Sequence, residues 1–243
     1  MNASQLCLSV SAVSKSYGGV AANRDISFNV EAGEIFGVIG PNGAGKTTLF
    51  NLISGFERPD SGTITFEGMN VTGERPDRLN RLGIGRTFQI MKPFLRMTVE
   101  ENVMMGALPR CGGLKEARAH ARECIALVGL EANATKLARE LSTGQRKRLE
   151  MARAMATRPK LLLLDEITGG VDLPSVRGLI ELVCRLRQEG VTLLVIEHNM
   201  RVIMRLADRV MFLNLGQKVT EGSASNVASH PQVRALYLGE AHA

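Results

Sequence analysis

Apolar and polar residues alternate along three short segments near the N-terminus of the chain. They are residues 6–13, residues 26–30 and the segment GTITFEG that begins at Gly62. Alternation with a period of two is typical of a strand that buries one face and exposes the other. We therefore expect these segments to form an antiparallel β subdomain.

Three other segments each carry a short, continuous apolar run. They are residues 34–40 (EIFGVIG), 160–166 (KLLLLDE) and 191–198 (VTLLVIEH). Runs of this length predict strands that are buried on both faces, as in a parallel sheet.

Apolar residues at helical spacing lie between these runs. The spacing predicts helices over about residues 45–56, 114–130 and 142–157. Pro174 predicts a further helix that it opens at the first position, with Asp172 or Leu173 as the cap. Residues 209–222 (RVMFLNLGQKVTEG) indicate a late hairpin.

The order of these elements predicts an α/β fold with a mostly parallel sheet. We expect a single domain over residues 1–243. In it, residues 1–89 and 158–243 form the core together with the antiparallel β subdomain, and residues 90–157 form an inserted helical subdomain.

Composition narrows the choice of ligand only slightly. The 243 residues are 44% hydrophobic and carry a net charge of +6, from 30 basic and 24 acidic residues, with no run of five like charges. This weak basic excess suits an anionic ligand or a place beside acidic lipid as well as it suits nucleic acid. We therefore expect no nucleic-acid partner.

Nothing in the sequence indicates a membrane span or an export signal. The aliphatic runs, such as residues 161–164, are far shorter than the roughly 20 residues that cross a bilayer. The first ten residues lack the charged region and apolar block of a signal peptide. The four cysteines form no CxxC pair, so we expect reduced thiols. We expect a cytoplasmic protein, whose role at a membrane would need a membrane-embedded partner.

Residues 40–48 read GPNGAGKTT and match the pattern G-x-x-x-x-G-K-[ST] in full. The glycines let backbone N–H groups turn inward around phosphate oxygens. Lys46 would neutralise the β- and γ-phosphates, and the Thr47 hydroxyl would hold Mg²⁺. A chance match is the alternative, and the buried strand before the motif and the helix after it argue against chance. The nucleotide-binding residues predicted here are Gly40, Pro41, Asn42, Gly43, Ala44, Gly45, Lys46, Thr47 and Thr48.

Asp165 and Glu166 lie at the C-terminal end of a buried strand, where open α/β sheets bind their ligands. Asp165 is placed to coordinate Mg²⁺, directly or through water, and Glu166 to orient and deprotonate the attacking water. The plainer alternative is a strand that ends in two surface carboxylates. The phosphate-binding motif upstream favours the functional interpretation.

Two further polar residues end predicted strands. His198 could bond the γ-phosphate and sense its presence, although a histidine at a strand end is more often structural. Gln89, in RTFQ, could reach the metal or the water, and the alternative is a solvated turn residue.

Residues 141–145 read LSTGQ and open the helix expected from residue 142. Ser142 and Gln145 form a capping box, which satisfies two backbone amides at the start of any helix. Residues 146–148 (RKR) then place positive charge on the first turn, at a cost of about 0.3–1 kcal/mol per exposed charge. An anion bound at this helix start would offset that cost.

In this order, the motifs resemble those of the nucleotide-binding subunits of ABC transporters, over almost the whole chain. Residues 40–48 match the Walker A loop, Gln89 the Q-loop, residues 141–145 the signature, and residues 161–166 the Walker B run. GGVD at 169–172 matches the D-loop, and His198 the switch histidine. Thr143 stands where the family usually has glycine, and Ile167 where proline is common.

The resemblance implies a P-loop NTPase core that binds ATP and Mg²⁺ and hydrolyses ATP. Tyr17 would stack on adenine. The implied catalytic residues are Lys46, Gln89, Glu166 and His198, and the implied metal ligands are Thr47, Gln89 and Asp165.

The resemblance also implies that two such subunits close head-to-tail around ATP. Ser142, Gly144 and Gln145 of one copy would contact the γ-phosphate held by the other, and Thr143 and Asp172 belong to the same nucleotide-binding set. Closure would drive two transmembrane permease subunits, with a periplasmic or extracellular solute-binding protein as an indirect partner. The chain would then lie at the cytoplasmic face of the inner membrane.

Within the family, the chain looks like the ATPases of branched-chain, or hydrophobic, amino acid importers, to which importers of urea or short amides are related. The resemblance rests on RTFQ, MTVEENVMMGAL, QRKRLEMARAMATRPKLLLLDE, VIEHNM and the tail HPQVRALYLGE. The tail also resembles the ATPase of the lipopolysaccharide exporter, which is the alternative. A soluble ABC ATPase of DNA repair or translation is a further alternative, as is a scaffold that no longer hydrolyses ATP.

Methionines are frequent between residues 91 and 105. Met is most often a gap-filling core residue. The alternative is an adaptable socket for a helix of a membrane partner. The residues concerned are Met91, Met97, Met104 and Met105.

Overall fold

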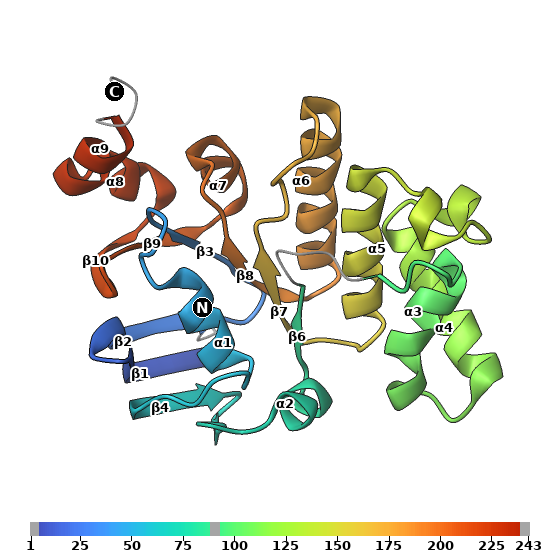
Figure 1. The fold of residues 1–243 in the computed structure, drawn as a ribbon, viewed down its shortest axis with the longest axis horizontal. Helices are drawn as coiled ribbons and strands as arrows, with labels where there is room; N and C mark the ends of the chain where they lie inside the picture. Colours follow the sequence, from blue (N-terminus) through green and yellow to red (C-terminus); the bar gives the residue numbers. More distant parts are fainter. Residues whose placement is uncertain (1–4, 88–92, 239–243) are drawn as a thin grey trace. The chain divides into compact units, whose positions relative to one another are not determined.

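The structure is a computed structural model that describes residues 5–87 and 93–238. The chain divides into two compact units, whose elements are labelled in Figure 1. The first comprises Met1–Leu79 with Thr192–Ala243, and the second comprises Asn80–Val191.

The first unit contains an antiparallel sheet of four strands in the order β2-β1-β4-β5. These are β1 (Leu6–Tyr17), β2 (Val20–Glu31), β4 (Ser61–Phe66) and β5 (Met69–Asn70). The predicted antiparallel strands are confirmed, but β1 and β2 are longer than expected. They pair up to Tyr17 and Val20, because the turn between them is made by Gly18 and Gly19, both with positive φ.

The same unit holds four strands of a second sheet, in the order β10-β9-β3-β8. They are β3 (Ile35–Ile39), β8 (Thr192–Ile196), β9 (Arg209–Asn214) and β10 (Gln217–Gly222). As predicted, β3 and β8 are fully buried and parallel, and β9 and β10 form a hairpin. The parallel pairing of β3 with β8 and β9 carries the ends of all three strands to one edge.

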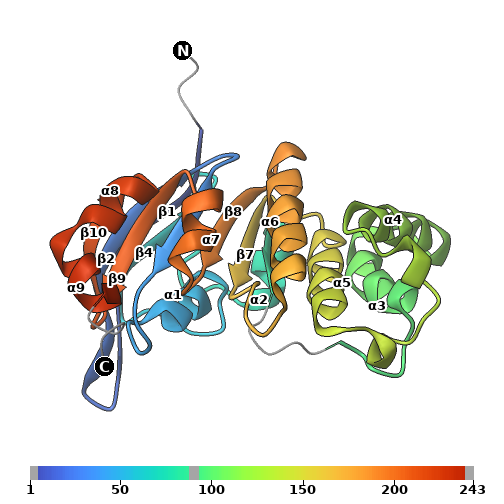
Figure 2. The same ribbon diagram turned by 90° about the horizontal axis from the view of Figure 1, so that it is seen from above.

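The helices of this unit are α1 (Lys46–Ile53), α7 (Met200–Leu206), α8 (Ala224–Ser229) and α9 (Pro231–Leu238), which Figure 2 shows from above. Helix α2 (Pro76–Leu82) runs across the boundary in sequence between the two units. Helix α1 ends three residues before the expected position. Gly55 has φ 76°, and a Cβ there would lie 2.3 Å from the carbonyl oxygen of Glu74, so the chain turns away.

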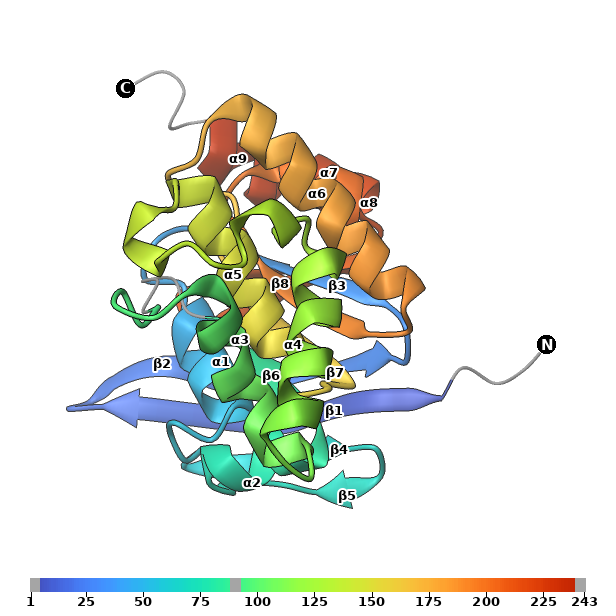
Figure 3. The ribbon, with the colours of Figure 1, turned by 90° about the vertical axis from the view of Figure 1, so that its right-hand side faces the viewer.

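The second unit contains β6 (Ile84–Arg86) and β7 (Leu161–Asp165), which pair in parallel. Its α-helices are α3 (Val99–Ala107), α4 (Leu114–Leu127), α5 (Thr143–Met155) and α6 (Leu173–Gln188). Short 3₁₀ turns lie at Leu108–Arg110, Glu131–Asn133 and Ala138–Glu140. Figure 3 shows α3 and α4 in front of α5, and both pack against it.

The predicted helices of the second unit are confirmed, with shifted ends. Asp172 is the N-cap of α6, so Pro174 occupies the second helical position rather than the first. Ala117 and Ala121 are fully buried on α4, and their small side chains let neighbouring helices approach closely. No helix in the described ranges is both long enough and apolar enough to cross a bilayer.

Candidate functional site

The loop between β3 and α1 has a backbone that glycine alone fits at two points. A Cβ on Gly40 would lie 2.1 Å from the carbonyl oxygen of Leu213. Gly45 has φ 99°, and its Cβ would lie 2.2 Å from the carbonyl oxygen of Ala22. The glycine spacing of the motif therefore follows from close backbone contacts as well as from room for phosphates.

Neighbouring strands support this loop through hydrogen bonds. The Gly216 N–H donates to the carbonyl oxygen of Ala44 at 3.1 Å. The side-chain amide of Asn23 donates to the carbonyl oxygen of Gly45 at 3.3 Å. Ala44 is buried, whereas Asn42 and Gly43 are exposed. The loop is thus built into the unit, with its tip accessible.

Lys46 lies along the loop that precedes it. Its Nζ donates to the carbonyl oxygens of Gly40 at 2.7 Å and Pro41 at 2.9 Å, and the side chain is only 7% exposed. Thr47 is exposed, and Thr48 is half-buried. Gly45 is the N-cap of α1 and gives no side-chain hydrogen bond to the first turn, so this helix start is suited to an anion.

Two other predicted residues lie in the same unit. His198 is exposed and follows β8, and because β8 is parallel to β3, His198 and the glycine-rich loop emerge at one sheet edge. Tyr17 ends β1 and is 43% exposed, with the Lys15 ammonium 5.5 Å from its ring centroid. Tyr17 belongs to the hairpin whose second strand, through Ala22 and Asn23, contacts Gly45.

In the second unit, Asp165 ends β7 and is only 3% exposed. Its Oδ2 accepts from Nη2 of Arg86 at 3.3 Å, and its backbone N–H donates to the Thr87 hydroxyl at 3.3 Å. Burial raises the pKa of Asp165 above its ordinary value, although the charge of Arg86 acts to lower it. The sequence gives no sign that Arg86 and Thr87 contact Asp165, because it does not show that β6 lies beside β7.

Glu166 is half-buried and has φ 48°, which is unusual for a residue other than glycine. Its carbonyl oxygen accepts from Nζ of Lys147 at 2.9 Å and from the Gly169 N–H at 3.3 Å. Lys147 is 6% exposed, and in the sequence it appears only as one of three consecutive cations on a helix turn.

The signature segment starts α5 as predicted. Ser142 Oγ accepts from the Gln145 N–H, and Gln145 Oε1 accepts from the Ser142 N–H, so the capping box is confirmed. Ser142 and Thr143 are exposed. A Cβ on Gly144 would lie 2.8 Å from the Ser175 hydroxyl, so a larger residue there would displace the Ser175 side chain.

The three cations that follow the signature do not gather at the helix start. Arg146 donates to the carbonyl oxygen of Arg139, Lys147 to that of Glu166, and Arg148 to that of Val128. Backbone carbonyl oxygens therefore already compensate these charges in part, and binding of an anion at this helix start stays a prediction.

The remaining predicted residues are less constrained. Asp172 is exposed and caps α6, without a hydrogen bond from its side chain to the helix. Gln89 and Met91 lie outside the described residues. Met104 is buried, Met97 is half-buried and Met105 is 44% exposed, so this group is divided between core and surface.

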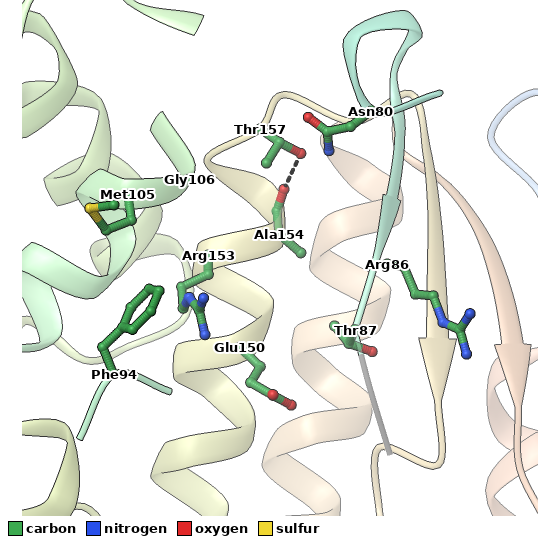
Figure 4. Close-up of a pocket in the computed structure, with 10 residues that line it drawn as sticks. All are labelled: Asn80, Arg86, Thr87, Phe94, Met105, Gly106, Glu150, Arg153, Ala154 and Thr157. Carbon is green, nitrogen blue, oxygen red and sulfur yellow. Dashed lines mark hydrogen bonds between the residues drawn. The ribbon is translucent and has the colours of Figure 1, made fainter. Parts of the chain in front are cut away.

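The second unit also contains a cavity of about 310 Å³ between α3, α5 and β6 (Figure 4). Phe94, Met105 and Arg153 line one side of it, and Arg86, Thr87 and Glu150 line the other. The Arg153 guanidinium lies 4.9 Å from the centroid of the Phe94 ring. Arg86 and Thr87 thus connect the cavity to Asp165.

Comparison with known proteins agrees with these features. The family model described as ABC transporter matches residues 23–169. The high-affinity branched-chain amino acid transport ATP-binding protein LivG of Salmonella typhimurium is 35% identical over 98% of this chain and 100% of its own length.

Solved structures give the same result. An ATP-binding cassette of an ABC transporter in its ADP conformation superposes with a TM-score of 0.88, at 31% identity over 96% of this chain and 99% of its own. A dimeric ATP-binding cassette bound to ADP and Pi, in a post-hydrolysis state, gives 0.80, at 27% identity over 89% of this chain and 98% of its own.

Proposed function

The chain belongs to the ABC transporter family, and we propose that it hydrolyses ATP to drive the transport of branched-chain or other hydrophobic amino acids. Related amides or urea are the alternative cargo. The observation that carries the proposal is the glycine-rich loop, whose close backbone contacts require glycine at Gly40 and Gly45. Such a loop followed by a helix is suited to the phosphates of a nucleotide.

Each nucleotide contact has a residue suited to it. Lys46 would exchange the two carbonyl oxygens that it now contacts for β- and γ-phosphate oxygens. Tyr17 offers an exposed ring on which adenine can stack. His198 emerges at the same sheet edge as the loop and would bond the γ-phosphate.

Mg²⁺ would be held by the Thr47 hydroxyl and the Asp165 carboxylate, with Gln89 as a third ligand. These are hard oxygen donors of the kind that Mg²⁺ takes. Among residues 5–87 and 93–238, no group of three or more His, Cys, Asp or Glu side chains could hold a metal ion. The ion would therefore complete its shell with phosphate and water, and it would neutralise charge on the transferring phosphoryl group.

Glu166 would orient the attacking water and accept its proton. It follows β7 directly, and its backbone is held by Lys147 and Gly169. A carboxylate fixed in this way is suited to act as a general base.

A second ATPase subunit would complete the site, in a homodimer or a heterodimer. The dimeric cassette among the solved relatives supports this arrangement. Ser142 and Thr143 are exposed at the start of α5 and open to contact by another molecule, and so is Asp172 at the start of α6. Gly144 and Gln145 lie in the same turn of α5.

Two transmembrane permease subunits would bind the ATPase pair at the cytoplasmic face of the inner membrane. The cavity lined by Phe94, Met105 and Arg153 is suited to receive side chains from a short helix of a permease. Exposed apolar side chains at Phe94, Leu95 and Met105 support this docking surface. A solute-binding protein outside the membrane would deliver the cargo to the permeases.

Phosphate release from ATP tests the enzymatic part of the proposal. We expect Mg²⁺-dependent turnover by the wild-type protein and a loss of at least about 100-fold in Glu166→Gln. Lys46→Ala should weaken ATP binding, whereas Lys115→Met, on the exposed face of α4, should behave as wild type. Unchanged binding and turnover in Lys46→Ala would refute the proposal.

Uptake tests the cargo. Cells that carry the chain with its permeases and binding protein should accumulate labelled leucine, and Glu166→Gln should abolish the accumulation. Turnover without uptake of leucine, urea or short amides would leave the ATPase assignment intact and reject the cargo.

A further inference from the structure

Lys147 makes a contact that the ATPase mechanism does not yet explain. It lies one turn into α5, is 6% exposed, and places its ammonium 2.9 Å from the backbone carbonyl oxygen of Glu166. A lysine ammonium is seldom buried to this degree unless a hydrogen-bond or ion-pair partner compensates for its lost hydration. Here the acceptor is the peptide of the residue proposed as general base.

The Glu166 peptide needs such support. Its φ of 48° lies in the left-handed region, where a side chain crowds the backbone, and such conformations persist only when their surroundings hold them. The Gly169 N–H contributes a second, longer bond to the same carbonyl oxygen, at 3.3 Å. Rotation of this peptide would redirect the Glu166 carboxylate.

The position of Lys147 also connects two parts of the proposed machinery within one chain. Its helix begins at Thr143, and Ser142, the N-cap before it, forms the capping box with Gln145. One turn further along α5, Glu150 lines the cavity that also contains Arg86 and Thr87. Lys147 therefore joins the signature helix to the turn after β7.

Given ATP hydrolysis as proposed above, we infer that Lys147 is a positioning residue for Glu166: its ammonium holds the Glu166 carbonyl oxygen and so fixes the direction of the carboxylate. In this proposal Lys147 acts through the Glu166 peptide and not on the reacting atoms. A small displacement of a general base is enough to slow catalysis strongly while nucleotide binding, which uses other residues, is retained.

Steady-state kinetics of Lys147→Met test this inference. This variant keeps the length and apolar stem of the side chain but lacks the donor. We expect kcat to fall roughly 10- to 100-fold, while ATP affinity and KM stay within about threefold of wild type. Lys147→Arg, which keeps a charged donor, should retain most of the turnover. Lys147→Gln replaces the methionine variant if the latter does not fold.

A matched control and a double variant separate positioning from general damage to the helix. Arg146→Met removes a comparable bond, from Arg146 to the Arg139 carbonyl 2.8 Å away, and should keep the wild-type kcat. In a Glu166→Gln background, Lys147→Met should lower the residual turnover no further, because it acts through Glu166. The inference would be overturned if Lys147→Met lowered the turnover of Glu166→Gln further, or if Arg146→Met lowered kcat as much as Lys147→Met does.

Hydrogen exchange gives a readout that does not depend on activity. Without nucleotide, Lys147→Met should exchange the amides of residues 166–170 faster than wild type, because the Gly169 N–H shares the freed acceptor. Wild-type protein without ATPase activity would reject the proposed function, and this measurement would still test the contact. Unchanged exchange would reject the contact itself.

Discussion

At the scale of single residues, the glycine-rich loop needs glycine for two different reasons, which are a positive φ and a lack of room for a Cβ. Gly43 and Gly45 both have positive φ, but only Gly45 has backbone within reach of a Cβ. The sequence motif shows both glycines and gives no sign of this difference, because the clashing carbonyl belongs to Ala22, on a distant strand.

The two glycines therefore predict unequal costs for the same substitution. Gly43→Ala should lower the free energy of unfolding by about 1 kcal/mol, for the strained φ alone. Gly45→Ala adds overpacking and should cost about 2–4 kcal/mol. Thermal or urea unfolding of both variants, without nucleotide, measures the difference. Equal costs would contradict the contact at Ala22.

The structure holds the four cysteines as free thiols. They differ in reactivity, because burial raises the pKa of Cys124 to about 12. At pH 8 only about one Cys124 in ten thousand would then be the reactive thiolate. Cys7 is buried as well, whereas Cys111 and Cys184 are half-buried.

Alkylation with iodoacetamide at pH 8, followed by mass spectrometry, should modify Cys111 and Cys184 well before Cys124 and Cys7. Denatured protein is the control and should be modified at all four sites alike. Early modification of Cys124 in the native protein would contradict its burial.

At the scale of elements, the β9–β10 hairpin is predicted by the sequence but its turn is not. Leu215 and Gly216 form a two-residue connection, and both have positive φ, as in a type I′ turn. The preferred first residue of that turn is Asn. Leu215 is 77% exposed, so its side chain gains little from burial.

Leu215→Asn should therefore stabilise the protein by about 1 kcal/mol and raise its Tm. Leu215→Ala, which removes the exposed apolar side chain without favouring positive φ, is the matched control and should give a smaller change. An Asn variant no more stable than the Ala variant would argue against the turn geometry.

Helices and strands were predictable where an apolar run or a helical periodicity extended over a long enough segment. The runs at β7 and β8 and the periodicity of α4 and α5 identified those elements within a few residues. Strand β5 has only two residues, which is too short for a pattern, whereas β6 (Ile84–Arg86) lies close before Gln89, where a short strand was expected to end. The ends of helices depended on contacts from elsewhere, as Gly55 shows.

At the scale of the whole molecule, the sequence indicated most of the chemistry that the proposal uses, since the motifs carry the phosphate loop, the carboxylates and the signature. It did not indicate the residues that support them. Arg86, Thr87 and Lys147 act through pairing of β6 with β7 and through the packing of α5, and neither is visible as local spacing.

The proposed dimer makes a prediction of its own. Isolated wild-type protein should be monomeric or weakly associated, and Glu166→Gln with saturating ATP and Mg²⁺ should form a stable dimer, because hydrolysis no longer reopens it. Light scattering measures the mass directly. Glu166→Gln combined with Lys46→Ala should remain monomeric, and a Glu166→Gln variant that stays monomeric would contradict closure around ATP.

The hydrogen bond from Gly216 to the carbonyl oxygen of Ala44 spans most of the polypeptide. During synthesis, the phosphate-binding loop emerges from the ribosome long before the hairpin that supports it. Until the β9–β10 hairpin has been synthesised, the phosphate-binding loop lacks the hydrogen bond from Gly216. ATP in the cell should thus protect the finished chain from proteolysis, but not nascent chains that stop before residue 209.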